Sequence, residues 1–307
     1  MRAAWTAGSV RAQALLNRRL GVAGTGGLAG CTSFSEALAR LAASPYGHDV
    51  RPDQTVDQAE HALAETVLWH LRVLAGWLPR SAAELMRACA AWFEIGNLLD
   101  HLRALHGADS RPPYQLGALA TAWPRLAVAG SPGELRAALA ASPWGDPGTD
   151  ETGAVAVTMW AGWAARMAAA SPHIRPWAAA GAALLAARER FLLQRPVPEL
   201  AARRLAGLLG ARQGDIGDFT GFAASLPSEA RWVLRAAENP GELWRAEEGW
   251  WHRVDQDARE LRRHPGPASQ PVVACVALLA VDARRCRTAL ELAARGGGRW
   301  EEFDALV

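Results

Sequence analysis

Residues that could bind a nucleotide occur in one glycine-rich stretch, residues 21–30, which reads GVAGTGGLAG. Gly24, Gly26 and Ala29 match the spacing GxGxxA, in which glycines let the backbone approach a pyrophosphate at the start of a helix. That chemistry requires a strand before the motif and a βαβ unit around it. A helical pattern precedes this stretch instead, so we expect a flexible loop that ends the preceding helix.

Residues for phosphate, metal or acid–base chemistry lack the spacing that such sites need. The chain has no lysine among its 33 basic residues, so it cannot contain a GxxxxGK[ST] phosphate loop. His61 and His70 are nine positions apart, and His101 and His106 are five apart. A spacing of about four would place two ligands side by side on a helix. We therefore predict no cofactor, no metal site and no catalytic residue, and expect that the chain is not an enzyme.

Bulk composition predicts a cytoplasmic chain without a strongly charged partner. The net charge of +2 argues against nucleic-acid binding and against attraction to an anionic membrane surface. The N-terminus is too polar for a signal peptide, and apolar runs such as 176–187 are shorter than the ~20 residues of a membrane span. Cys31, Cys89, Cys275 and Cys286 form no close pair, which indicates reduced, buried thiols.

The strongest pattern is an internal repeat. Residues 34–47, FSEALARLAASPYG, return at 132–145 as PGELRAALAASPWG, with eight of fourteen positions identical at a shift of 98. Each copy predicts a short helix and a defined stop, because the residue before a proline is biased out of the helical region. Two unrelated segments with common turn chemistry are the alternative, but a duplicated helical module explains the match better.

Structural turns are expected at the end of both copies. Pro45 and Pro143 fix the backbone at the start of each turn, and Gly47 and Gly145 are predicted to hold the positive φ that closes it.

Long helices follow each short one, and strand patterns are absent. A short PGEL segment occurs at 132–135 and again at 240–243. We therefore expect a third, less regular module at the end of the chain, in which one helix runs on to about residue 263. A turn at 264–267 and a tail helix at 300–306 are also expected. The other predicted long helices are 3–20, 52–78, 81–106, 150–170, 172–195 and 270–295.

These elements predict an all-α chain of three pseudo-repeated helical-bundle modules. The modules are residues 1–110, which include the N-terminal helix, then residues 111–212 and residues 213–307.

Four segments in the same order resemble the C subunits of the V/A-type rotary ATPases, which are called d subunits in the eukaryotic enzymes. They are similar to that family's opening helix, its leucine-rich helix with a Pro-Tyr-Gly turn, its aromatic–acid helix and its last-repeat helix. The glycine-rich stretch stands where the family has a more helical connection. The segments are SVRAQALLNRRL at 9–20, LARLAASPYG at 38–47, FEIGNLLDHLRALHG at 93–107 and LAVDARRCRTALELA at 279–293.

This resemblance implies a funnel of three modules with pseudo-threefold arrangement. It implies a non-catalytic central-rotor subunit that is peripheral on the cytoplasmic face of the membrane. Its partners would be the central-stalk subunits and the membrane-embedded proteolipid ring, and its role would be to couple the two during ATP-driven proton or sodium transport or ATP synthesis. The alternative is a helical-repeat scaffold or adaptor that binds another protein.

Candidate contacts with the stalk are charged residues on the second long helix of each module. Arginine suits a torque-bearing joint, because its planar fork forms paired hydrogen bonds to carboxylates and keeps its charge. The candidates are Asp100, Arg103, Arg188, Asp282 and Arg287.

Overall fold

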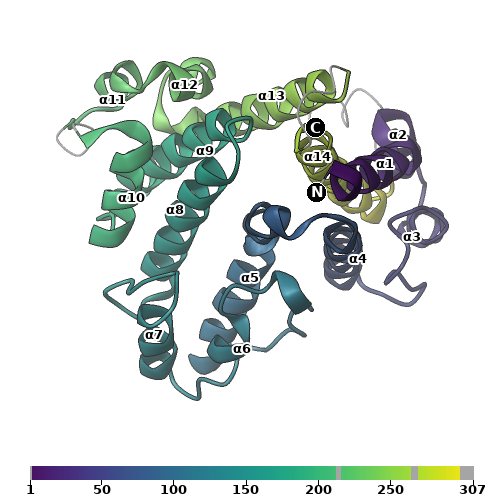
Figure 1. Cartoon of the computed structure of the whole chain (residues 1–307), viewed down its shortest axis with the longest axis horizontal. Coiled ribbons are helices and arrows are strands. Elements are labelled where there is room, and N and C mark those ends of the chain that lie inside the picture. The colour runs from purple at the N-terminus through teal and green to yellow at the C-terminus, as the bar shows by residue number, and fades with distance from the viewer. Residues whose placement is uncertain (1, 212–215, 264–268, 298–307) are drawn as a thin grey trace. The chain divides into compact units, whose positions relative to one another are not determined.

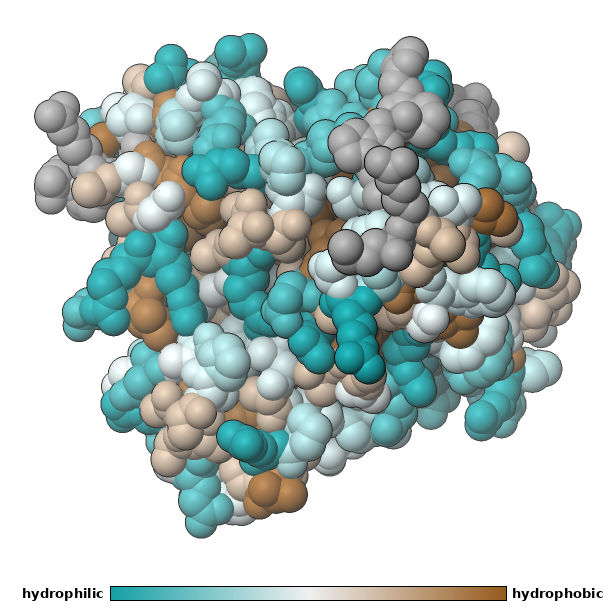
Figure 2. All heavy atoms as spheres, in the orientation of Figure 1, coloured by the Kyte–Doolittle hydropathy of each residue, from teal (hydrophilic) through white to brown (hydrophobic). Residues whose placement is uncertain are grey.

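The computed structural model describes residues 2–211, 216–263 and 269–297 (Figure 1). Helices make up 74% of the chain, and the described residues contain no strand, which confirms the predicted all-α class. None of the described helices combines the length and apolar character that crossing a membrane requires. On the face shown in Figure 2, hydrophilic and hydrophobic residues are intermixed. The predicted turn at 264–267 and tail helix at 300–306 lie outside the described residues.

The chain divides into two compact units, residues 1–83 with 251–307 (unit 1) and residues 84–250 (unit 2). Unit 1 joins the two ends of the sequence. Its helices are α1 (Arg2–Arg18), α2 (Gly21–Ala29), α3 (Phe34–Ala42), α4 (Val56–Trp77), a 3-10 turn (Arg80–Ala82), the second part of α13 (Leu243–Arg263) and α14 (Gln270–Ala294).

Helix α14 is the centre of unit 1, because α1, α2, α3 and α4 all pack against it (Figure 1). Its apolar side chains, such as Val272, Leu278 and Leu290, are fully buried. Helix α4 starts at a reciprocal capping box, in which Thr55 and Gln58 each accept the other's backbone N–H. Local capping therefore fixes where α4 begins, and burial against α14 fixes which face turns inward.

The glycine-rich stretch is helical, so the predicted loop is wrong. Gly21 has φ +63°, which lets the chain turn sharply between α1 and α2. The helix then buries Leu28 and Ala29, which are 2% and 1% exposed, and packs against α14. Tertiary packing thus outweighs the low helix propensity of four glycines in nine residues.

Unit 2 contains the second copy of the repeat and a pair of adjacent long helices, α8 and α9. Helix α10 packs against both members of this pair. The helices are α5 (Ala83–Leu105), a 3-10 turn (Gly117–Leu119), α6 (Trp123–Leu126), α7 (Pro132–Ala140), α8 (Thr152–Ala170), α9 (Arg175–Ala187) with a π turn (Arg188–Leu192), α10 (Glu199–Leu209), α11 (Phe219–Ser225), α12 (Ser228–Arg231), 3-10 turns at Trp232–Ala236 and Pro240–Glu242, and the first part of α13.

One core of unit 2 forms where α5, α6, α7 and α8 meet. Ile95 and Leu98 of α5 pack with Leu126, Leu139 and Met159, each at most 1% exposed. Helix α5 is buried around most of its circumference, as expected for a helix at the centre of a core.

All of the predicted long helices are present, with ends that differ from the prediction by a few residues. In the third repeat a 3-10 turn at Pro240–Glu242 leads directly into α13, which ends at Arg263 as expected. The division into modules 1–110, 111–212 and 213–307 follows the repeat rather than compactness, and it stays a prediction.

Candidate functional site

The repeated short helix is capped identically in both copies. Helices α3 and α7 each have nine residues and begin after Ser33 and Ser131. The hydroxyl oxygen of each serine accepts the N–H of the glutamate three positions on, Glu36 or Glu134, at 3.2 Å. Each glutamate carboxyl group in turn accepts the N–H of the residue before the serine. Both ends of the capping motif are therefore shared by the two copies.

The turn after each short helix is also the same. Ser44 and Ser142 donate their hydroxyls to the carbonyl three positions back and accept the N–H of Tyr46 and Trp144 at 3.1 Å. The glycine after the aromatic residue donates its N–H to the serine carbonyl at 3.1 Å in both copies. So many matched contacts at one offset favour duplication over two unrelated segments.

The two turn glycines differ in backbone conformation. Gly145 has the predicted positive φ, +74°, but Gly47 does not, so that part of the prediction is wrong. Gly47 is needed for a different reason: a Cβ built there would lie 2.0 Å from the carbonyl oxygen of Ala42. The first turn requires glycine because the backbone passes too close to α3 for any side chain.

A buried carboxyl group receives the aromatic side chain of the first turn. The hydroxyl of Tyr46 donates to Asp282 of α14 at 2.8 Å, across 236 positions of sequence. The other carboxyl oxygen accepts the N–H of Gly21, the first residue of α2, at 2.9 Å. Asp282 therefore both caps the N-terminus of α2 and holds the first turn against α14. Burial raises the pKa of Asp282, although the hydrogen bond from Tyr46 and the positive charge of Arg19 act in the opposite direction and lower it.

The second copy has the equivalent contact with different residue types. The indole N–H of Trp144 donates to Glu94 of α5 at 2.7 Å, and Glu94 also accepts the N–H groups of Thr121 and Ala122 at the start of α6. Arg166 lies over the Trp144 ring, 4.9 Å from its centroid. In both copies an aromatic donor and a helix N-terminus thus share one buried carboxyl group, an arrangement that we call the aromatic–carboxyl lock.

Another buried acid, Glu189, follows Glu94 by 95 positions and precedes Asp282 by 93, whereas the buried Asp255 of α13 falls outside this spacing. The partner of Glu189 is not aromatic: Arg195 holds both of its oxygens at 3.1 Å. Glu94 and Glu189 were not predicted as buried groups. The regular spacing of acids within apolar helices was the signal that could have found them.

The predicted stalk contacts differ in exposure. Arg103, Arg188 and Arg287 are exposed; Arg103 pairs with Asp100 one turn earlier, and Arg287 pairs with Glu60 at 3.2 Å. Asp282 is fully buried and not available for a surface contact. The prediction of Asp282 as a stalk contact is therefore wrong.

The three arginines do not stand at equivalent positions when the buried acids set the register. Arg103 lies nine positions after Glu94, Arg188 one before Glu189 and Arg287 five after Asp282. Exposure is therefore what the three arginines share, and the expected common position is not supported.

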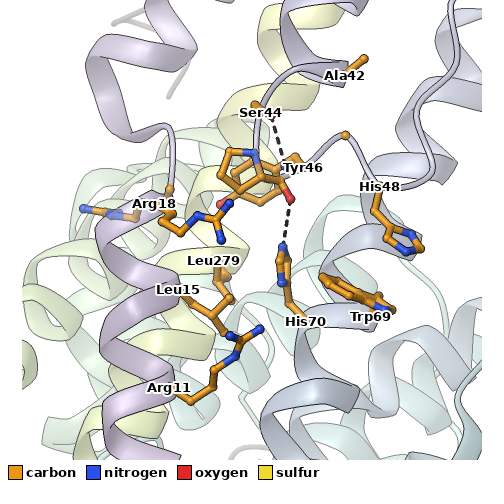
Figure 3. A pocket seen from close by; sticks show the side chains of 13 residues that line it. Arg11, Leu15, Arg18, Ala42, Ser44, Tyr46, His48, Trp69, His70 and Leu279 are labelled. Carbon is orange, nitrogen blue, oxygen red and sulfur yellow. Dashed lines mark hydrogen bonds between the residues drawn. The ribbon is translucent and has the colours of Figure 1, made fainter.

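A pocket of about 340 Å³ opens in unit 1 beside the first turn (Figure 3). Arg11 and Arg18 extend into it from α1, opposite His70 of α4. Nε2 of His70 donates to the carbonyl of Pro45 at 3.0 Å, which anchors the turn to α4. The sequence excluded His70 only as a metal ligand, and the structure shows that His70 is buried, at 6% exposed.

Acidification should destabilise unit 1 through His70. Burial, followed by the charges of Arg11, Arg18 and His48, lowers the pKa of His70 below its ordinary value of 6.5. The unfolded chain then binds more protons than the folded chain between the lowered pKa and 6.5, so the free energy of unfolding falls as pH decreases through that window. We expect a steeper loss from pH ~7 to ~5 in the wild type than in His70→Gln, measured by urea denaturation. Parallel pH profiles of the two proteins would contradict this.

Other reactive side chains form no site in the described residues. All four cysteines are free and buried, as predicted, and burial raises the pKa of Cys89 and Cys275 to about 12. Thiols with such pKa values are poor nucleophiles at neutral pH. No group of three metal-ligating side chains occurs in the part of the chain that the structure describes.

Searches of this sequence against protein-family models and against curated proteins find no match.

Proposed function

We propose that this chain is the non-catalytic central-rotor subunit of a V/A-type rotary ATPase or ATP synthase. In this role it is the socket that joins the central stalk to the proteolipid ring. The proposal starts from the four ordered segments that resemble the rotor-socket family, and the aromatic–carboxyl lock is the structural observation that supports it best.

The lock suits a part that carries torque. It ties together segments that are 50 positions apart at Glu94 and Trp144, and 236 apart at Tyr46 and Asp282. Hydrogen bonds to a buried carboxyl group are directional and strong, because little water competes for them. In unit 1 the Tyr46–Asp282 contact joins the first and last parts of the sequence. Torque can therefore pass directly between these two parts as well as along the chain that connects them.

The spacing of the buried acids supports the threefold internal repeat that a funnel of three modules requires. Glu94, Glu189 and Asp282 follow one another at intervals of 95 and 93 positions, close to the 98 positions between the two short helices. Each predicted module contains one member of this series, and the third module also contains the buried Asp255 on α13.

The direct test is to recover the partners of the tagged chain from native membranes. We expect proteolipid, stalk and catalytic subunits of one rotary ATPase to be recovered together. Recovery of an unrelated protein in their place would favour a helical scaffold, and the rotor proposal would then fail.

Charge reversal at the exposed arginines should weaken the stalk joint. We expect Arg103→Glu, Arg188→Glu and Arg287→Glu together to reduce affinity for purified stalk subunits at least tenfold, about 1.4 kcal/mol, and to affect ring binding less. Each replacement should cost no more than ~1 kcal/mol of folding stability, because exposed ion pairs contribute little.

The matched control reverses three other exposed arginines, Arg51, Arg125 and Arg235, which changes the net charge equally. Equal loss of stalk affinity in both triple variants would mean that overall charge matters and that the three chosen positions do not.

A further inference from the structure

The pocket beside the first turn is lined by cations and by no acid. Its walls are α1, the segment 42–48, α4 and one residue of α14. Arg11, Arg18 and Arg19 contribute guanidinium groups, and His48 and His70 contribute imidazoles. No aspartate or glutamate lines it.

The three arginines have no salt-bridge partner in the part of the chain that the structure describes, and none of them forms a side-chain hydrogen bond there. The nearby acids are engaged elsewhere, since Asp282 accepts from Tyr46 and Gly21, and Asp49 pairs with His48 at 3.0 Å. Asp282 and Asp255 attract Arg19 from outside the lining, but no acid lines the pocket beside Arg11 and Arg18, so the pocket concentrates positive charge.

Three buried polar atoms in this lining lack a hydrogen-bond partner. They are Nε of Arg11, a terminal nitrogen of Arg19 and Nδ1 of His70. Unpaired buried polar atoms are unfavourable, and an anion in the adjoining pocket would be attracted by the arginines that carry two of them. The two arginine atoms are donors, and His70 becomes a second donor at Nδ1 when protonated, because Nε2 already donates to Pro45.

In the second copy of the repeat, a helix fills the space beside the turn that the pocket occupies in the first copy. There α10 covers the turn: Leu200 and Arg204 approach Gly145, and the Arg204 guanidinium donates to the carbonyls of Trp144 and Thr158. In the first copy the turn borders the open pocket instead, and the arginines beside it have no such acceptor. The first copy therefore has an open pocket lined by arginine donors at the place where α10 covers the turn of the second copy.

We propose that this pocket binds a phosphate group, either inorganic phosphate or the phosphate of a small monoester or lipid headgroup. A phosphate offers more acceptor oxygens and more negative charge than one carboxylate, which matches several guanidinium forks and a protonated imidazole. The volume is at the lower end of the ~300–1,000 Å³ usual for small-molecule sites, and Leu15, Trp69 and Leu279 provide an apolar wall for an organic part. This inference does not depend on the rotor proposal.

Calorimetric titration of the full chain tests the site with three probes: inorganic phosphate, phenyl phosphate, and phosphatidylcholine vesicles that contain phosphatidic acid. We expect saturable binding of at least one phosphate probe and none of acetate. Preference for the soluble probes assigns a small molecule as the source, and binding of the vesicles alone assigns a lipid headgroup. Absence of binding to all three probes would overturn the proposal.

Variants locate the binding. Arg18→Gln changes an exposed residue and should fold normally, and we expect it and Arg11→Gln to weaken binding at least tenfold. Arg72→Gln is the matched control, because Arg72 is exposed on the same helix as His70 but does not line the pocket. Equal affinity in Arg18→Gln, Arg11→Gln and Arg72→Gln would place any binding elsewhere and contradict the proposal.

Proton uptake gives a signature that a general loss of stability would not produce. Sulfate, which does not titrate near neutral pH, should bind with uptake of protons as His70 becomes cationic between the anion and Pro45. Titration in two buffers of different ionisation enthalpy measures this uptake. His70→Gln retains a donor for Pro45, so it should fold and bind more weakly without proton uptake. Unchanged uptake in this variant would remove His70 from the site.

Discussion

Glu94→Ala is expected to destabilise unit 2 by about 3–5 kcal/mol, the range seen when one partner of a buried charged contact is removed. Glu94 is fully buried and accepts three hydrogen bonds, from Thr121, Ala122 and Trp144. The alanine variant leaves three donors without an acceptor and the start of α6 without its cap. The free energy of unfolding from urea titration measures the effect.

Two companion variants separate the lock from a general effect of losing an acid. Glu94→Gln keeps one carbonyl oxygen but turns an amide N–H₂ toward backbone donors, so we expect an intermediate loss of about 2 kcal/mol. Glu84→Ala removes an acid from the same helix whose side chain is 78% exposed, and it should change stability by no more than ~0.5 kcal/mol. If Glu94→Ala were as stable as Glu84→Ala, the lock would not contribute to folding.

Gly47→Val should cost about 3 kcal/mol or more, although its φ is not positive. The Cβ would lie 2.0 Å from the carbonyl oxygen of Ala42 and 2.7 Å from its Cα, and both are backbone atoms of α3 and cannot move aside as a side chain would. The turn must therefore shift away from α3, which also displaces Tyr46 from Asp282. Thermal and urea denaturation would both report the loss.

The second copy supplies the comparison for this variant. Gly145→Val places a β-branched residue at φ +74° beside Leu200, for which we expect a cost of about 1–3 kcal/mol. Gly76 is exposed on α4 with no heavy atom within 4 Å of a built Cβ, so Gly76→Ala should be neutral or slightly stabilising. A Gly47 variant as stable as the Gly76 variant would show that the close approach is not rigid.

The lock and the pocket meet at one residue. Tyr46 donates to Asp282 on one side and lines the pocket on the other. Burial and the charge of Asp282 raise the pKa of Tyr46 well above 10, so its hydroxyl stays a donor at neutral pH. A ligand in the pocket would therefore affect the hydrogen bond between Tyr46 and Asp282, which holds the first turn to α14.

Local sequence alone determined the helical class and most helix ends. Apolar residues at helical spacing predicted α4, because a 3.6-residue stripe can be buried only as a helix. The Ser-Pro-aromatic-Gly turns were visible because their hydrogen bonds join residues two or three positions apart. The duplication was visible for the same reason.

Only the tertiary structure decided features that depend on contacts between distant segments. The helix over Gly21–Ala29 exists because α14 buries it and Asp282 caps it, and neither partner can be inferred from nine glycine-rich residues. Gly47 is needed because of the neighbouring backbone, which its own φ preference does not reveal. The buried acids and the cationic pocket also escaped prediction, because a charged residue is usually exposed and only the assembled neighbours show that it is enclosed.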